Sequence, residues 1–99
     1  MRIVYTPAAR RQIANQIGYL IDQGAIRPAK RLRTRITAFV RDFLARHPRI
    51  GRPIPEHDCY ESAIPRTPYI VIYRIDGSTD TLIVLALFHG SQERSGFRP

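Results

Sequence analysis

Two long apolar runs, TPYIVIYRI at residues 67–75 and TLIVLALFH at residues 81–89, constrain the fold of this chain most. Both are rich in β-branched and aromatic residues, and the five residues between them, DGSTD, are typical of a hairpin turn. Each run is apolar on both of its faces. We therefore expect two central antiparallel strands that are largely covered on each side.

Two amphipathic helices are predicted upstream of these strands. Thr6 followed by Pro7 is a typical helix start. Apolar residues then recur at intervals of three and four to about Gln23. The second helix is expected to run from about Ala25 to about Arg46, with apolar side chains on one side and arginines on the other. Both helices need an apolar surface against which to pack.

Two shorter strands complete the predicted fold. They are RIVY at residues 2–5 and CYESAI at residues 59–64, and the proline-rich residues 47–58 between helix and strand are interpreted as an extended connector. The predicted order is β-α-α-β-β-β. We expect one α+β domain over residues 1–99, with a two-helix hairpin packed on a mainly antiparallel four-stranded sheet.

Positive charge is concentrated in the first half of the chain. Residues 1–55 carry 12 Lys and Arg against two acids, whereas residues 56–99 carry four Arg against six acids. This asymmetry indicates an anionic partner for the first half. Fifteen of the 16 basic residues are arginine, which suits planar, paired contacts with carboxylate or phosphate. Charge alone leaves nucleic acid and an acidic protein both open.

The sequence offers little for a metal or a cofactor. His57 and Cys59 form one possible ligand pair, and without a second pair we expect no metal. Cys59 is the only cysteine, and we interpret it as a buried apolar residue in a protein of a reducing compartment. Phosphate-loop, dinucleotide and serine-hydrolase motifs are absent, so no cofactor is expected. No apolar run suits a membrane span or an export signal, so we expect a cytoplasmic protein.

His89 is the polar residue that ends the last apolar run. Strict alternation places Ile83, Leu85, Leu87 and His89 on one face of the strand. The antiparallel register with the preceding strand brings His89 within reach of Arg66. Such a pair could bind and cleave an RNA phosphodiester, with the guanidinium stabilising negative charge and the imidazole moving a proton.

Glu61 belongs to the same hypothesis, whereas Arg74 lies at the opposite end of the hairpin from His89 and need not meet it. Glu61 lies on the adjacent strand and could serve as a second acid or base, and Arg74 ends an apolar row at the turn end of its strand. The alternative interpretation is structural. In it His89 hydrogen-bonds a strand end or turn while Arg66 pairs with Glu61, because ion pairs between neighbouring strands are common.

Three segments give the chain a family resemblance. HPRIGRPI at residues 47–54, PYIVIYRI at residues 68–75 and VLALFHGSQER at residues 84–94, in this order of elements, resemble the RelE/ParE toxin superfamily of bacterial type II toxin–antitoxin modules. The resemblance covers nearly the whole chain. The last segment looks like the terminal H-G-x-R-[DE] corner of the family, with Gln92 delaying the charged pair Glu93 and Arg94.

The superfamily implies two different activities. RelE-like members cut messenger RNA in the ribosomal A site, and that resemblance assigns Arg66 and Arg74 to charge stabilisation, Glu61 to a base and His89 to an acid. ParE-like members inhibit DNA gyrase without such a catalytic set. The long helical hairpin and the HG corner favour ParE, as does the net negative charge of the half that carries the sheet.

The resemblance also implies a protein partner. A cognate antitoxin would fold along the toxin, burying apolar side chains while its acids meet arginines. We expect it to dock in the groove between the helical hairpin and the sheet, with Arg27, Arg31 and Arg35 as rim contacts. Plasmid stabilisation and growth arrest are the expected biological roles. Sequence-specific DNA binding by this chain alone is not expected, because no recognition helix is evident.

Overall fold

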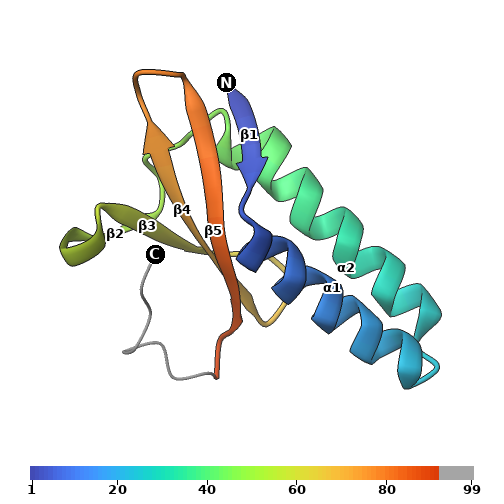
Figure 1. The fold of residues 1–99 in the computed structure, drawn as a ribbon. Helices are drawn as coiled ribbons and strands as arrows, with labels where there is room; N and C mark the ends of the chain where they lie inside the picture. Colours follow the sequence, from blue (N-terminus) through green and yellow to red (C-terminus); the bar gives the residue numbers. More distant parts are fainter. Residues whose placement is uncertain (92–99) are drawn as a thin grey trace.

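The computed structural model describes residues 1–91, which fold as two α-helices against a five-stranded sheet (Figure 1). The elements are β1 Arg2–Tyr5, α1 Pro7–Asp22, α2 Ile26–Ala38, η1 Phe39–Leu44, β2 Arg52–Ile54, η2 Pro55–His57, β3 Cys59–Ala63, β4 Tyr69–Asp76 and β5 Thr81–His89. The strand order is β1-β5-β4-β3-β2. β1 is parallel to β5, and the other neighbouring pairs are antiparallel. The predicted α+β class and helical hairpin are confirmed.

The helices begin and end where the local chemistry requires. Thr6 Oγ1 accepts a hydrogen bond from the N–H of Ala9 at 3.1 Å, which caps α1 just before Pro7. Gly24 has a φ of 79°, so the chain can reverse into α2 there. α2 continues as η1, six residues of π-helix that end at Leu44, close to the predicted end of the second helix.

The sheet has a fifth strand that the prediction of four strands omitted. β2 is only three residues long and pairs antiparallel with β3 at the edge of the sheet. It includes Pro53, which lacks an N–H and is therefore tolerated only at an edge. The segment that was predicted as a connector thus contributes a short, blunted edge strand.

A β-bulge at Leu85 changes which side chains of β5 share a face. The register between β4 and β5 shifts in mid-strand, where Leu85 is the extra residue. Ile83 and Leu85 pack in the cluster on the face away from the helices, whereas Leu87 belongs to the cluster on the helix face. His89 pairs with Tyr69, also of the helix-side cluster. The prediction of one continuous row ending at His89 is therefore wrong.

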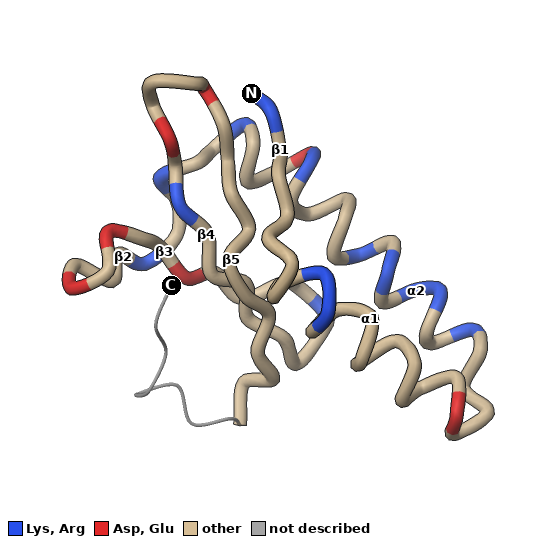
Figure 2. The backbone as a smooth tube through the Cα atoms, viewed as in Figure 1, with Lys and Arg blue, Asp and Glu red and all other residues tan. Residues whose placement is uncertain are grey.

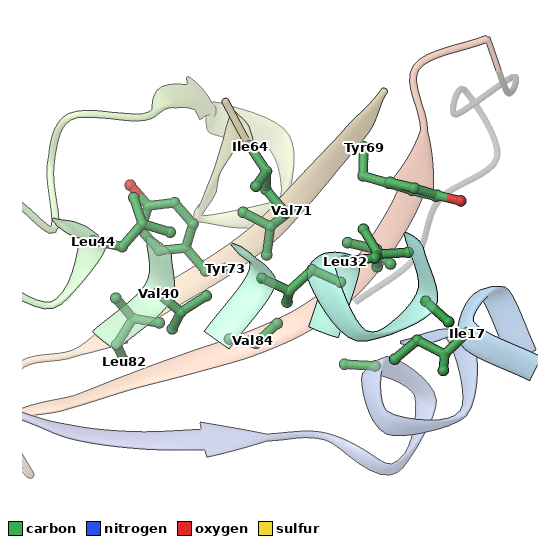
Figure 3. Close-up of a cluster of buried hydrophobic side chains, with 14 residues drawn as sticks. Ile17, Leu32, Val40, Leu44, Ile64, Tyr69, Val71, Tyr73, Leu82 and Val84 are labelled. Carbon is green, nitrogen blue, oxygen red and sulfur yellow. The ribbon is translucent and has the colours of Figure 1, made fainter. Parts of the chain in front are cut away.

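The main core lies between the helices and the sheet (Figure 3). Its labelled members are Ile17, Leu32, Val40, Leu44, Ile64, Tyr69, Val71, Tyr73, Leu82 and Val84. A smaller buried cluster of Cys59, Ile72, Leu85 and Ala86 lies on the other face of the sheet. Both faces of β4 and β5 are therefore apolar, as their sequences predict.

Tyr73 connects the segment of residues 47–58 to the centre of the sheet through hydrogen bonds. Its side chain is 0 % exposed, and its hydroxyl donates to the carbonyl of Pro48 at 2.8 Å and accepts the N–H of Gly51 at 3.1 Å. A Cβ on Gly51 would lie 2.6 Å from that hydroxyl, so only glycine permits this approach. The start of β2 is thereby fixed against β4.

α1 supplies hydrogen bonds to the part of β5 that extends beyond β1. Thr6 Oγ1 donates to the carbonyl of Leu85 at 3.1 Å, and Gln12 Oε1 accepts the N–H of Leu87 at 2.8 Å. β1 pairs only with residues 81–84 of β5. The side chains of Thr6 and Gln12 therefore replace a strand partner along the bulged part of β5.

Candidate functional site

Basic residues follow one another along α2 (Figure 2). This helix contains five basic residues and no acidic one, namely Arg27, Lys30, Arg31, Arg33 and Arg35. Its N-terminus has no side-chain cap and no acid in the first turn, so the partial positive charge of the helix end adds to that of the side chains. α2 is therefore the element best suited to an anionic partner.

A pocket of about 220 Å³ lies between α2 and the loop that precedes β4. Its lining consists of Leu20 from α1, of Pro28, Arg31, Leu32 and Arg35 from α2, and of Arg66, Thr67, Pro68 and Tyr69 from the loop and β4. Apolar groups make up most of the wall, and the described lining includes no Asp or Glu. The pocket therefore suits an apolar group next to an anion.

A second cavity of about 260 Å³ adjoins the first along α2. Arg35 and Arg66 line both cavities, and Arg35 Nη1 donates to the carbonyl of Arg66 at 3.1 Å between them. The far end of the second cavity is lined by Phe39 and Ile64. We call the two cavities together the α2 groove. Arg27 is exposed and lines neither cavity.

The loop wall of the groove is held by its own hydrogen bonds. Thr67 Oγ1 donates to the carbonyl of Ile64 at 2.9 Å and accepts the N–H of Tyr69 at 3.1 Å. Arg66 adopts a left-handed backbone with φ of 63°, which is uncommon for a non-glycine residue. Because prolines 65 and 68 restrict the same loop, the position of Arg66 is well defined.

Two candidate nuclease residues lie on the sheet face away from the helices. Glu61 pairs with Ile72 across the sheet and forms an ion pair with Arg52, whose Nε donates to Glu61 Oε1 at 2.8 Å. Arg74 donates to the backbone carbonyls of His57 at 3.0 Å and Asp58 at 3.3 Å. Both side chains therefore hold the β2–β3 end of the sheet in place.

His89 lies on the other face, at the far end of β5. Its ring contacts Tyr69 edge to face with centroids 5.6 Å apart, and its Nδ1 lies 2.7 Å from Ser91 Oγ. The hydroxyl of Tyr69 donates to Gln16 Oε1 at 2.8 Å, and burial raises the pKa of that hydroxyl. Gln92, Glu93 and Arg94 of the family-like corner lie outside the described residues.

The four candidate nuclease residues are thus distributed over different parts of the molecule. Glu61 and Arg74 share one face of the sheet, His89 lies on the opposite face, and Arg66 lines the α2 groove. Besides Arg66, the loop side chains of the groove, Thr67 among them, were not predicted as site residues. The only sequence signal for them is the pair of prolines around a basic residue.

Metal binding finds no support in the described part of the chain. Residues 1–91 contain no group of three or more His, Cys, Asp or Glu side chains placed to hold a metal ion. Cys59 is buried, and that burial raises the pKa of its thiol. It is therefore a poor candidate for a nucleophile, in agreement with its interpretation as a small core residue.

Comparison with known proteins decides the family. The sequence matches the profile of the "ParE toxin of type II toxin-antitoxin system, parDE" over residues 3–94. The chain belongs to the ParE toxin family. It is a toxin of the RelE/ParE superfamily, as the three sequence segments predict. No curated protein sequence matches this ParE-family chain.

Solved structures of related complexes share the fold of this ParE-family toxin. The Mycobacterium tuberculosis RelBE2 toxin–antitoxin complex is similar with a TM-score of 0.66 and 24% identity, covering 89% of this chain and 95% of that one. The chromosomal ParDE system of P. aeruginosa gives 0.72 at 14% identity, covering 90% and 95%. The E. coli RelBE complex gives 0.55 at 14% identity, covering 92% and 98%. At these identities the similarity is one of fold.

Within residues 1–91, no helix has the length and apolar character needed to cross a membrane.

Proposed function

We propose that this ParE-family toxin inhibits DNA gyrase and is neutralised by a cognate antitoxin. The observation that carries the proposal is the separation of the candidate nuclease residues. Glu61 and His89 belong to opposite faces of the sheet, and Glu61 already forms an ion pair with Arg52. General acid–base catalysis needs both groups within hydrogen-bond reach of one substrate. Inhibition by binding does not require Glu61 and His89 to reach the same substrate.

The hydrogen bonds of Arg74 support the same interpretation. Its guanidinium donates to two backbone carbonyls, which hold it to the turn before β3. A side chain used in this way stabilises the sheet rather than a transition state. The profile match to the ParE family and the basic helical hairpin agree with a toxin that acts by binding a protein.

An antitoxin partner is part of the proposal. The similar solved structures are described as RelBE and ParDE toxin–antitoxin complexes or systems. An acidic, partly apolar antitoxin segment matches the charge of α2, and Arg27, Arg31 and Arg35 are the predicted rim contacts. Cytoplasmic location, growth arrest and plasmid stabilisation belong to the same proposal, and sequence-specific DNA binding by the toxin alone does not.

The second candidate function is a ribosome-dependent messenger RNA endonuclease of the RelE type. It is favoured by the position of His89, which sits at a strand end against an aromatic ring. In this hypothesis His89 acts as the acid, Glu61 as the base, and Arg66 and Arg74 stabilise charge. The structure would then have to rearrange to bring these groups to one phosphodiester.

Induced expression in a sensitive bacterial host separates the two functions. We expect growth arrest with loss of negative supercoiling in a reporter plasmid and without codon-specific cleavage of ribosome-bound message. The variants His89→Ala and Arg66→Ala should remain toxic if they stay folded. Cleavage of message that both variants abolish would support the nuclease instead. Unchanged growth with soluble protein present would indicate a chain that is not toxic.

A further inference from the structure

One face of α1 points away from the rest of the described structure. The helix packs against α2 and β5, and a turn of about 100° per residue gathers five of its other residues into one stripe. The stripe consists of Arg11, Ala14, Asn15, Gly18 and Asp22. Gly18 is half-buried, and the other four residues are exposed.

Two large apolar side chains flank this stripe. Tyr19 is 61% exposed and Ile21 is 46% exposed. The helical turn places them on opposite sides of the stripe, each about 80° from Arg11 around the axis. Large apolar residues that gather on one exposed surface are typical of a protein–protein contact. The stripe with its two flanks is called the α1 face below.

Gly18 lies within the helix although the described structure leaves room for a side chain there. A glycine inside a helix is less favourable than alanine or glutamine. Within residues 1–91, no atom lies within 4 Å of a Cβ built on Gly18. A missing side chain does allow a second helix to approach closely, because the distance between packed helices depends on the side chains at their contact. Gly18 therefore suits helix–helix packing with another molecule.

The charges of the α1 face favour a second copy of the same helix. α1 carries Arg10 and Arg11 near its start and Asp22 at its end (Figure 2). Within residues 1–91 neither Arg11 nor Asp22 forms an ion pair. When two α1 helices lie antiparallel, Arg11 of each copy can face Asp22 of the other. A strongly acidic partner would be attracted to α2 instead, which has five basic residues and no acid.

The register that joins these charges also matches the remaining residues of the face. With Arg11 opposite Asp22, Asn15 lies opposite Gly18, so that the two helices can come close together at that point. On one flank, Ile21 lies beside Ala14 of the second copy. On the other flank, the two copies of Tyr19 are neighbours. A single register therefore satisfies the charge, the size and the apolar surface of the face.

We propose that the α1 face is a self-association surface, through which two copies of this chain form a weak antiparallel dimer. The contact is the same patch on both copies, as a twofold axis requires. α1 has 16 residues and is therefore about 24 Å long. One helix pair of this length covers less than the roughly 1,200 Å² of a stable complex, so the dimer should dissociate on dilution. This proposal depends on neither the gyrase target nor the antitoxin.

The test is sedimentation velocity of the full chain over a series of protein concentrations. The unaltered chain should shift from monomer to dimer as its concentration rises. Arg11→Asp should weaken the dimer about tenfold, because symmetry puts two Asp–Asp contacts in place of two ion pairs. Arg10→Asp is the matched control, since it makes the same change of charge about 100° away on the same helix. It should weaken the dimer less than about threefold.

Two further variants test the register and the close approach. Arg11→Asp combined with Asp22→Arg exchanges the two charges and should restore the dimer to within about threefold of the unaltered chain. Gly18→Gln should raise the Tm, because glutamine is the better helix former. The same variant should weaken the dimer at least about tenfold, because its side chain occupies the contact. A structural defect would lower the Tm instead.

Four results would overturn the proposal. The first is a monomer at every soluble concentration. The second is an equal effect of Arg10→Asp and Arg11→Asp, which would mean that only overall charge controls association. The third is a charge exchange that does not restore the dimer, since the two residues would then not face each other. The fourth is a monomeric toxin whose Gly18→Gln variant no longer inhibits gyrase, which would assign the α1 face to gyrase.

Discussion

Replacing Tyr73 with phenylalanine removes one oxygen atom and leaves two backbone groups without their partner. The hydroxyl of Tyr73 donates to the carbonyl of Pro48 at 2.8 Å and accepts the N–H of Gly51 at 3.1 Å. A buried polar group that loses its partner costs about 1–3 kcal/mol. Gly51 is buried and Pro48 is half-buried. The carbonyl of Pro48 can therefore hydrogen-bond to water, which offsets part of the free energy lost. We expect the free energy of unfolding to fall by about 2–4 kcal/mol.

Urea unfolding followed by circular dichroism measures this loss. The slope of the unfolding free energy against urea should stay the same while the midpoint falls. In thermal unfolding, about 3 kcal/mol corresponds to a decrease in Tm of roughly 12–24 °C for a domain of this size. Tyr60→Phe is the matched control, because the hydroxyl of Tyr60 accepts its hydrogen bond from the exposed Arg49, at 3.2 Å. A loss below about 0.5 kcal/mol in Tyr73→Phe would mean that the two backbone groups do not depend on the Tyr73 hydroxyl.

Three further changes test the same account. Gly51→Ala should destabilise the protein by about 1–3 kcal/mol, because the new Cβ would lie 2.6 Å from the Tyr73 hydroxyl, and urea unfolding measures it. Burial raises the pKa of Tyr5, Tyr69 and Tyr73. The neutral phenols therefore contribute stability that is fully present below the ordinary tyrosine pKa of about 10 and is lost above it, as unfolding at a series of alkaline pH values should show. Burial also raises the pKa of the Cys59 thiol, so iodoacetamide at pH 8 should modify native protein far more slowly than unfolded protein.

Much of the fold could be predicted because it depends on local patterns. The periodicity of the helical segments and the β-branched runs determined the element order, and Thr6 with Pro7 marked the start of α1. β2 could not be predicted, because three residues that include Pro53 carry too little strand signal. Its pairing depends instead on Gly51 approaching Tyr73, which lies far along the chain.

The faces of β5 were harder to predict for a related reason. Every residue from Leu82 to Phe88 is apolar, so the sequence gives no indication that Leu85 is the extra residue of a bulge. The bulge moves His89 to the helix face and away from Glu61. Local periodicity therefore identified His89 as a strand-end residue but assigned its neighbours incorrectly.

The candidate site was predictable only in part. The charge of α2 indicated an anionic partner, and Arg31 and Arg35 were predicted as rim contacts from a family resemblance. Their convergence with Arg66 depends on how closely α2 approaches the loop before β4, which is a tertiary contact without a local sequence signal. Whether an antitoxin contacts these arginines stays a prediction.

Gyrase inhibition by binding is tested most directly in a supercoiling assay. Purified toxin is titrated into a reaction in which gyrase and ATP supercoil relaxed plasmid, once with the unaltered chain and once with His89→Ala. We expect inhibition at amounts of toxin close to those of gyrase, equal for the two proteins, because binding and not proton transfer is the proposed activity. Full supercoiling in the presence of excess folded toxin would contradict the account, and so would inhibition that disappears when His89 is replaced.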